Sequence, residues 1–257
     1  MARAAPVTSL LLFALSVVGC QARRRPGEAD KTAPEVPGPP SEARDSTTPG
    51  LVKEFQSADY FWRQAEVAKK IVERGDDTAI ESLQSYLDHD DRHIRCNAAL
   101  VLAGLGDDRG IDAISGVLRD RSDRPAGQGI AGGNWTVQAQ IRADRYYAVH
   151  VLGALKKPEA VPVLLPLLED DEVAYKVAWA LGEIGDARAV APLIRALGHT
   201  HPNVRVIAAD SLAKLRARSA LPRLRSLMND NEKASFGEQM SVADAARAAI
   251  ASLEQNP

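Results

Sequence analysis

The chain has 257 residues, of which 45% are apolar and 26% charged. This composition is typical of a folded protein and excludes a chain that is disordered over its whole length. The formal net charge is −2; Arg3 contributes one positive charge and residues 21–50 are balanced, so the part from residue 51 onward carries −3. A mildly acidic domain is a poor nucleic-acid binder, because attraction to phosphate supplies much of that affinity.

The N-terminus combines Arg3 with an apolar run over residues 10–18. Nine residues of helix rise about 14 Å, less than half of a hydrocarbon core of about 30 Å, so we do not expect a permanent membrane span. A charged start followed by a short apolar run is typical of a signal peptide, which we place at residues 1–19.

Residues 17–20, Val-Val-Gly-Cys, resemble the lipobox of bacterial lipoproteins. The resemblance implies cleavage before Cys20, a diacylglyceryl group on its sulfur and a fatty acyl group, such as palmitate, on its amino group. An ordinary secretory signal with an incidental cysteine is the alternative. The residue after the cysteine is Gln21 rather than an aspartate, which resembles the signal that sorts lipoproteins to the outer membrane of Gram-negative bacteria. We therefore predict an exported protein that is lipid-anchored to the cell envelope, in the outer membrane facing the periplasm if the host is Gram-negative.

Residues 20–50 form the next segment, an acylated cysteine and a proline-rich tether. Residues 21–50 hold six of the fifteen prolines, and Val36 is their one large aliphatic side chain. Such a segment cannot bury enough apolar surface to fold, so we predict that it is disordered. The folded part is then expected to be a single repeat domain over residues 51–257.

Five segments of this domain share one apolar pattern. Each has apolar residues at its first and fourth positions and, one turn later, at its eighth, which is the spacing of one face of an amphipathic helix. They begin at Ile80, Ile111, Val161, Val190 and Leu221. A second helix is expected after each, marked by Leu102, Leu152, Leu181, Leu212 and Leu253. Glycines in the turns that follow, as in LAGLGDD and LGEIGDA, can adopt the left-handed conformation that closes a helix. A further helix around Ile71 precedes the five pairs as a cap.

Two helices in about 30 residues, joined by turns such as "ALGEIGD", resemble the HEAT-like repeats grouped with phycobilisome lyases. The resemblance implies an all-α fold: a right-handed HEAT-like α-solenoid of about five helix pairs plus the N-terminal capping helix. It identifies the architecture more closely than the function, because the family includes scaffolds, pigment lyases and hydroxylase-type enzymes.

Two repeats carry extra residues, at 121–140 and 229–240. Both insertions lie between the first and second helix of their repeat, so we expect them to project from the same edge of the solenoid. Insertions on one face of a repeat protein often mark its binding face.

The sequence contains few signs of catalytic chemistry. HEAT-type hydroxylases bind iron through His-Glu pairs, and no His-Glu dipeptide occurs among the five histidines. Cys96, alone once Cys20 is acylated, is expected to be a buried apolar residue. We therefore predict no metal, no cofactor and no catalytic residue.

Aromatic residues of the second helices form the candidate binding site. If Ala98, Leu102 and Leu105 face the core, helical periodicity places positions 96 and 100 on the opposite side. In the two middle repeats these positions are Tyr146, His150, Tyr175 and Trp179, which we call the aromatic strip. Trp135, in the first insertion, is expected to close over it. Aromatic residues with polar tips are frequent anchors in protein recognition, although packing between repeats would explain these rings equally well.

These predictions support two functional hypotheses. The main one is a lipid-anchored scaffold of the cell envelope that binds a protein or peptide partner through the concave face of the solenoid and has no catalytic role. The alternative is a HEAT-type enzyme or a lyase-like binder of a small ligand, with a pocket under the 121–140 insertion. A spacer that binds nothing in particular is a third possibility. Whether the chain is an enzyme stays open.

Overall fold

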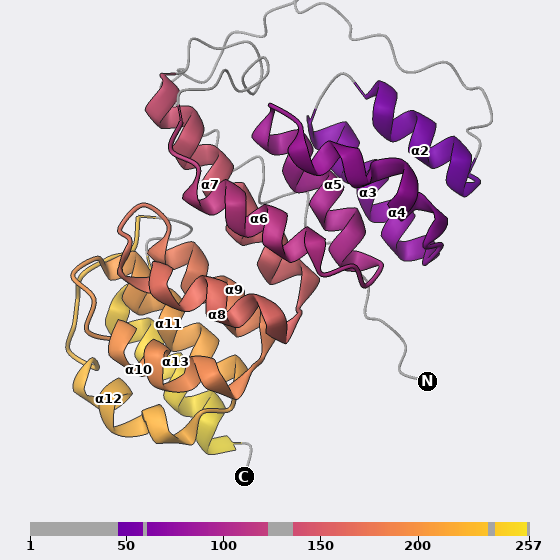
Figure 1. Cartoon of the computed structure of the whole chain (residues 1–257). Coiled ribbons are helices and arrows are strands. Elements are labelled where there is room, and N and C mark those ends of the chain that lie inside the picture. Colours follow the sequence, from indigo (N-terminus) through magenta and orange to yellow (C-terminus); the bar gives the residue numbers. More distant parts are fainter. Residues whose placement is uncertain (1–45, 59–60, 123–135, 236–239, 256–257) are drawn as a thin grey trace, which may run out of the picture. The chain divides into compact units, whose positions relative to one another are not determined.

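A computed structural model describes residues 46–58, 61–122, 136–235 and 240–255, all of which lie in the compact unit formed by residues 44–257. These residues are helical, apart from turns, loops and an isolated β-bridge between Lys233 and Ser241 (Figure 1). The elements are α2 (Thr48–Ser57), α3 (Phe61–Arg74), α4 (Thr78–Leu83), η1 (Gln84–Asp88), α5 (Arg92–Gly104), α6 (Arg109–Arg119), α7 (Val137–Leu155), η3 (Pro158–Ala160), α8 (Val161–Leu164), η4 (Leu165–Glu169), α9 (Ala174–Ile184), η5 (Ala187–Ala189), α10 (Val190–Ala196), α11 (Pro202–Lys214), η6 (Arg218–Ala220), α12 (Leu221–Ser226) and α13 (Val242–Gln255).

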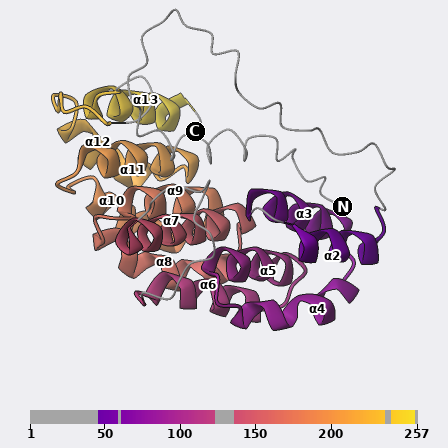
Figure 2. The same cartoon turned by 90° about the horizontal axis from the view of Figure 1, so that it is seen from above.

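The helices form antiparallel pairs that stack in chain order. The second helices α3, α5, α7, α9, α11 and α13 make one layer, in which each contacts the next (Figure 2). Shorter first helices, several of them beginning or ending in a 3-10 turn, form the other layer. The predicted all-α solenoid of helix pairs is therefore confirmed. The predicted capping helix is α3, and α2 precedes it and packs against it.

The core includes the fourth positions of the first-helix motifs and the marker leucines of the second helices. The fourth residue of each first-helix motif is fully buried, and so are four of the five marker leucines, while the fifth, Leu253, is 2% exposed. The five buried fourth-position residues are Leu83, Ile114, Leu164, Leu193 and Leu224. Because each repeat buries these side chains against its neighbours, stability is distributed along the stack rather than concentrated in one centre.

The turns after the second helices confirm the expected role of glycine. Gly106 and Gly185 adopt φ values of 99° and 79°, where a residue without a Cβ meets no steric penalty. Lys156 and Arg216 occupy the corresponding turns of two other repeats, both with φ 53°. The helix therefore closes in the same left-handed conformation even where the sequence lacks glycine.

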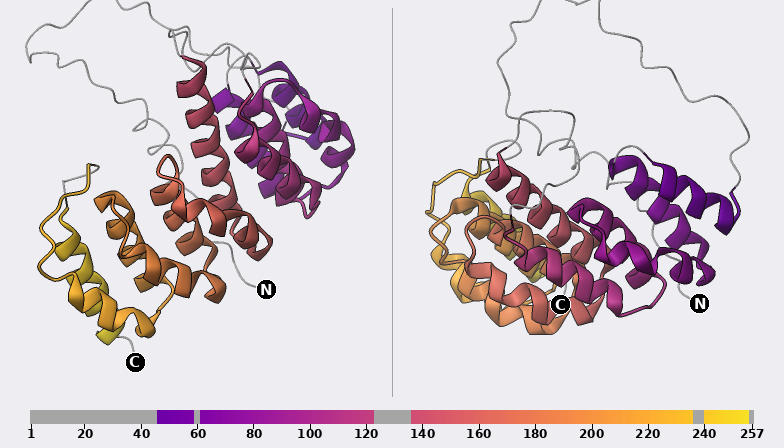
Figure 3. Two further views of the ribbon diagram at one scale, coloured as in Figure 1. Left: turned by 60° about the vertical axis from the view of Figure 1, so that its left-hand side comes forward. Right: turned by 45° about the horizontal axis from the view of Figure 1, so that its top comes forward.

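The longest second helix, α7, follows the first insertion. Its 19 residues compare with 11 in α9 and 13 in α11, and Figure 3 shows it running on past its neighbours. The last residues of the predicted insertion, 137–140, are thus the first turn of α7, capped by the hydroxyl of Thr136, which accepts a hydrogen bond from the amide of Ala139.

A ladder of arginines links neighbouring repeats. Arg95, Arg145 and Arg205 occupy equivalent positions in the sequence, which predicts pairing with acidic turn residues such as Asp107 and Asp186. This prediction is wrong, because those two aspartates bind Arg109 and Arg188, two residues further along the chain. The ladder acids come from the turn after the next first helix: Asp120 for Arg95, Asp170 and Glu172 for Arg145, and Asp230 and Glu232 for Arg205.

Candidate functional site

The aromatic strip lies across the contact between α7 and α9. The Tyr146 and Tyr175 rings have centroids 5.9 Å apart and are inclined by 43°, while His150 and Trp179 stack at 5.0 Å and 11°. All four side chains are half-buried. The rings therefore pack on one another between two repeats and still present part of their surface to solvent.

A close approach of the two helices makes room for this stack. A Cβ placed on Gly153 of α7 would lie 2.7 Å from Cζ3 of Trp179 and 2.9 Å from the Cα of Ala180. Both distances are well below the separation of about 3.5–4.0 Å at which carbon atoms attract. Gly153 therefore allows α9 and the Trp179 ring to approach the backbone of α7.

Lys176 of α9 lies within the strip. Its Nζ atom is 3.7 Å from the centroid of the Trp179 ring and 5.0 Å from that of Tyr146, and the residue is 5% exposed. Burial lowers the pKa of the Lys176 ammonium to about 7, against a weaker opposing effect of Glu183. The faces of two aromatic rings thus hold a cation that titrates near neutral pH.

The other ionisable groups of the strip are uncharged near neutral pH. Burial, and then the nearby Lys176 ammonium, lower the pKa of His150 to about 3. Burial also raises the pKa values of the Tyr146 and Tyr175 phenols, which share a hydrogen bond. His150 is consequently a neutral ring that stacks, and the strip offers planar surfaces, phenol groups and one amine.

The strip does not continue into the adjacent repeats. At the equivalent positions, Cys96 and Val206 are buried, and Asp210 of α11 is an exposed carboxylate. Trp135, which was expected to close over the strip, and Cys20, the predicted lipidation site, both lie outside the described residues. The four rings of α7 and α9 are therefore the predicted site residues that the structure brings together.

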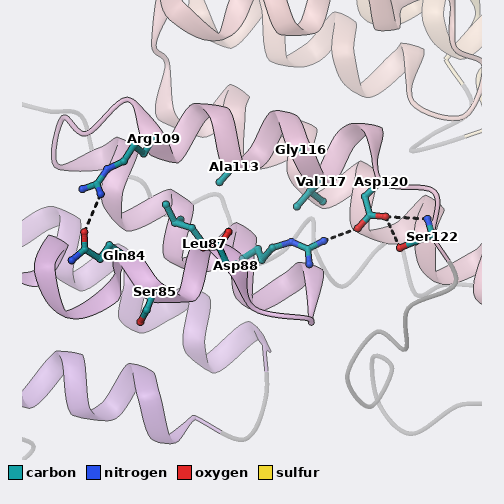
Figure 4. Close-up of a pocket in the computed structure, with 11 residues that line it drawn as sticks. Gln84, Ser85, Leu87, Asp88, Arg109, Ala113, Gly116, Val117, Asp120 and Ser122 are labelled. Carbon is teal, nitrogen blue, oxygen red and sulfur yellow. Dashed lines mark hydrogen bonds and ion pairs between the residues drawn. The ribbon is translucent and has the colours of Figure 1, made fainter.

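A groove runs between η1 and α6, on the first-helix layer (Figure 4). It has a volume of about 790 Å³, and Leu87, Ala113, Gly116 and Val117 form its apolar part. At one end Arg109 donates a 2.9 Å hydrogen bond to Gln84, and at the other Arg95 pairs with Asp120 at 2.7 Å. Ser122, the last described residue before 123–135, lies on its edge. No aromatic-strip residue lines this groove.

Buried polar residues lie behind this end of the groove. Arg92, 1% exposed, binds Asp120 through Nε at 3.2 Å and Asp144 of α7 through a terminal nitrogen at 3.4 Å, and it also donates to the Ser122 carbonyl. His93 Nδ1 lies 3.2 Å from Asp144. Burial raises the pKa of Asp144, although His93, Gln140 and Arg92 act to lower it. Arg92 thus connects the residues on both sides of the first insertion.

Neither a metal centre nor a thiol nucleophile is found in the part of the chain that the structure describes. Within it, no group of three histidine, cysteine or acidic side chains could hold a metal ion. Cys96 is fully buried, and its burial raises the pKa of the thiol far above neutral, so the reactive thiolate does not form.

Lys176 was not identified from the sequence, although a signal was present. Positions 97, 147, 176 and 207 follow the same 50, 29 and 31 residue spacing as the marker leucines. These equivalent positions hold Asn97, Tyr147, Lys176 and Ile207, so Lys176 is the charged residue among three neutral ones. A buried charge is costly unless a partner compensates it, and this difference between repeats is the signal that marks Lys176.

Comparisons with known proteins identify related chains. The curated "Bilin biosynthesis protein PecE" of Nostoc sp. (strain PCC 7120 / SAG 25.82 / UTEX 2576) is 32% identical over 151 residues, which cover 58% of this chain and 53% of that protein. "Phycocyanobilin lyase subunit alpha" of Synechococcus elongatus is 35% identical over 108 residues, covering 38% and 40%. The chain thus spans about half the length of the curated relatives it matches.

Solved structures of low sequence identity also match. The complex of CpcE and CpcF of phycocyanin lyase from Nostoc sp. PCC7120 has 21% identity and a TM-score of 0.39, covering 80% of this chain and 82% of that one. A computationally designed armadillo repeat protein for modular peptide recognition has 18% identity and a TM-score of 0.41, covering 80% and 99%.

These relatives correct the main functional prediction. A lipid-anchored scaffold of the cell envelope, and the localisation predicted with it, are wrong: the curated relatives are named for bilin biosynthesis and for a lyase subunit. In the described ranges, no helix is long and apolar enough to cross a bilayer. The lyase-like alternative agrees better with the relatives, and the resemblance to phycobilisome-lyase-type repeats is confirmed.

The family itself follows from a match to the sequence model described as HEAT repeats. The match covers residues 48–131, 137–191 and 168–236, which is well over half of the chain and includes the helices that carry the aromatic strip. The chain therefore belongs to the HEAT-repeat family.

Proposed function

We propose that this chain is a lyase-type HEAT-repeat subunit that binds a bilin, an open-chain tetrapyrrole, and acts together with a protein partner. The curated relatives support the ligand class, because their names refer to bilin biosynthesis and to a phycocyanobilin lyase. The word "subunit" in one of those names, and the two-protein complex among the solved structures, are the reason for including a partner.

The observation that carries the proposal is the pair of ring contacts between α7 and α9. His150 and Trp179 are stacked at 5.0 Å, and Tyr146 and Tyr175 are 5.9 Å apart, so four half-buried rings form one patch. A bilin is a conjugated ligand whose pyrrole rings can stack on such surfaces, and an aromatic contact is worth about 0.5–1.5 kcal/mol beyond the area it buries. The strip thus offers a complementary surface for this ligand class.

The test is a titration of the full chain with phycocyanobilin, followed by the ligand's absorbance and by tryptophan fluorescence. We expect saturable binding, and Trp179→Leu is expected to weaken it about two- to tenfold, because one aromatic contact is lost. Trp62→Leu is the matched control, since Trp62 is exposed on α3, away from the strip, and its replacement should leave the affinity unchanged.

The groove between η1 and α6 provides the competing location, and Gly116 allows the two to be distinguished. A Cβ at Gly116 meets nothing within 4 Å, so Gly116→Leu fills the groove without a clash at its first carbon. Binding that survives Gly116→Leu and weakens in Trp179→Leu supports the strip. Binding that is lost in Gly116→Leu and unaffected by Trp179→Leu, or no binding of bilin, would overturn the proposal.

The partner is tested by co-expression with a second lyase-type HEAT subunit from the same genome, followed by size-exclusion chromatography with light scattering. We expect a heteromeric complex of defined mass. Elution of the two chains as separate species at micromolar concentration would contradict this part of the proposal.

A further inference from the structure

We infer that Lys176 makes the aromatic strip selective for an anionic ligand group, a carboxylate, and that the protein takes up a proton when such a ligand binds. The inference deepens the proposed function and rests on it for the identity of the natural ligand. The charge preference itself follows from the surroundings of Lys176 and can be tested with any planar carboxylate.

The environment of Lys176 differs from that of the other buried cations. Arg92, Arg145 and Arg205 are between 1% and 7% exposed, and each is bound to at least one carboxylate. Lys176, at 5%, is buried to the same degree, but among the residues that the structure describes no carboxylate pairs with it. A buried ammonium is ordinarily paired with an anion. Within the described residues, Lys176 lacks the carboxylate partner that each of the three buried arginines has.

The ring contacts compensate the ammonium only in part. Trp179 and Tyr146 present ring faces at 3.7 Å and 5.0 Å from Nζ, which favour a cation electrostatically. An ammonium has three N–H donors, and an aromatic face is a weak acceptor compared with a carboxylate oxygen. A ligand carboxylate placed beside the rings would accept these donors while the conjugated part of the same ligand stacks.

The charge of Glu183 acts on Lys176, but no nearby acid pairs with it in the described part of the chain, because each one is bound to another cation or exposed. Glu183 binds Lys156 at 3.3 Å and Lys214 at 2.9 Å, and Asp210 binds Lys214 at 3.0 Å. The other buried charges on the packed helices have partners of their own: Asp144 binds Arg92, Arg145 binds Asp170, and Arg205 binds Glu232. The titratable and charged groups on the elements packed against Lys176 are Arg142, Asp144, Arg145, Tyr146, Tyr147 and His150 on α7, Tyr175 and Glu183 on α9, Arg205, Asp210 and Lys214 on α11, and the exposed Glu169 on η4.

The pKa of Lys176 itself, lowered to about 7, lies between about pH 6 and pH 9. The pKa of His150 is about 3, and the pKa values of the two phenols are raised, so their charges stay constant over this interval. A bound carboxylate favours the ammonium form and raises its pKa, which means that binding above about pH 7 draws a proton from solution. Affinity for an anion should therefore fall about tenfold per pH unit above about pH 7, up to the pKa of the complex.

The first test compares phycocyanobilin with its dimethyl ester, which keeps the conjugated system and loses both carboxylates. We expect the wild-type chain to bind the acid at least about tenfold more tightly at about pH 6, a ratio typical of a charge-assisted contact. Lys176→Met should abolish the preference, and Lys53→Met, an exposed lysine on α2, should retain it. Equal affinities for acid and ester, or a preference that persists in Lys176→Met, would overturn the inference.

The second test needs no variant and measures the proton directly. Isothermal titration in buffers of different ionisation enthalpy, at about pH 8, should show uptake approaching one proton per bound acid and none for the ester. This readout stays valid if Lys176→Met fails to fold. Binding of the acid without proton uptake, and with an affinity independent of pH, would overturn the inference.

A third probe separates the inference from the proposed function. 1-Pyrenebutyrate and its methyl ester are planar ligands unrelated to bilins, and the strip should prefer the acid with the same pH dependence. If phycocyanobilin does not bind but pyrenebutyrate does so selectively, the proposed function fails and the charge preference stands. If the pyrene acid shows no preference over its ester, the inference fails even where phycocyanobilin binds.

Discussion

Gly153→Ala tests whether the close approach of α7 and α9 creates the aromatic strip. The new Cβ would lie 2.7 Å from Cζ3 of Trp179, 2.9 Å from the Cα of Ala180 and 2.9 Å from its Cβ. Contacts of this type are favourable at about 3.5–4.0 Å, so α9 and the indole must move by about 1 Å. Two of the three atoms belong to Ala180, within a helix, and cannot move independently of α9.

The expected loss of stability combines two opposing effects. Alanine is better than glycine inside a helix by about 1 kcal/mol. Overpacking of a well-packed contact costs about 1–3 kcal/mol, which leaves a net loss of about 1 kcal/mol for Gly153→Ala. In a domain of this size that corresponds to a fall of about 2–4 °C in the melting temperature. The matched control is Gly116→Ala in α6, where a Cβ meets nothing within 4 Å and a gain of similar size is expected.

The assay is thermal unfolding followed by far-ultraviolet circular dichroism, together with fluorescence in a Trp62→Phe, Trp135→Phe background in which Trp179 is the one emitter. Gly153→Ala should melt about 4–8 °C below Gly116→Ala, and its Trp179 emission should shift as the indole is displaced. If the two variants melt together and the emission is unchanged, α7 and α9 are not in close contact at Gly153.

Three further predictions concern charge. Arg145 and Arg121 bind the same acids, Asp170 and Glu172, but are 1% and 50% exposed. Arg145→Met should therefore cost about 2–3 kcal/mol in urea unfolding and Arg121→Met less than about 1 kcal/mol; equal losses would contradict the difference in burial. The pKa of His150 is about 3 in the folded protein and about 6.5 when unfolded, so the unfolded state binds the extra proton and stability is lost as pH falls below about 6.5. His150→Phe should reduce this loss, measured as melting temperature between about pH 7 and pH 4, and an unchanged slope would refute the assignment. For Lys176, whose folded pKa is about 7, the unfolded state holds more protons between about pH 7 and pH 10.5, so folding stability rises with pH in that interval. Lys176→Met should thus be stabilising at about pH 6, with a gain that shrinks toward about pH 10, and a gain independent of pH would count against it.

The sequence was sufficient for the layers of the solenoid because each repeat is a local pattern. Helices and turns of this kind form within about 30 residues, so local sequence indicates them. The signals are the apolar fourth positions, such as Leu164 and Leu193, and the turn glycines, such as Gly185. The same period placed Tyr146 next to Tyr175 and His150 next to Trp179, since 29 residues separate each pair and helices α7 and α9 are in register.

Contacts between repeats were harder to predict, because they depend on which side chains reach across a turn. Arg145 binds Asp170 and Glu172 rather than the acid after a second helix, since the turn that follows η4 lies beside the middle of α7. Lys176 is a similar case: a lysine on a helix is usually solvated, and its burial results from Trp179 on one side and Tyr146 of the preceding repeat on the other. Neither the ring distances nor the missing carboxylate is visible in a single repeat.

The position of the strip within the stack also limits which changes can affect it. In a solenoid each repeat packs on its neighbours, so the environment of a site is set by the repeats that form it and those that flank them. The strip occupies the junction of α7 and α9, and on either side the equivalent positions hold Cys96 and Val206, which are buried. A ligand that uses both rings and ammonium is therefore confined to this junction. Substitutions in α3 or α13 that do not unfold their repeat should leave its affinity unchanged, whereas changes at Gly153 or Glu183 should alter it.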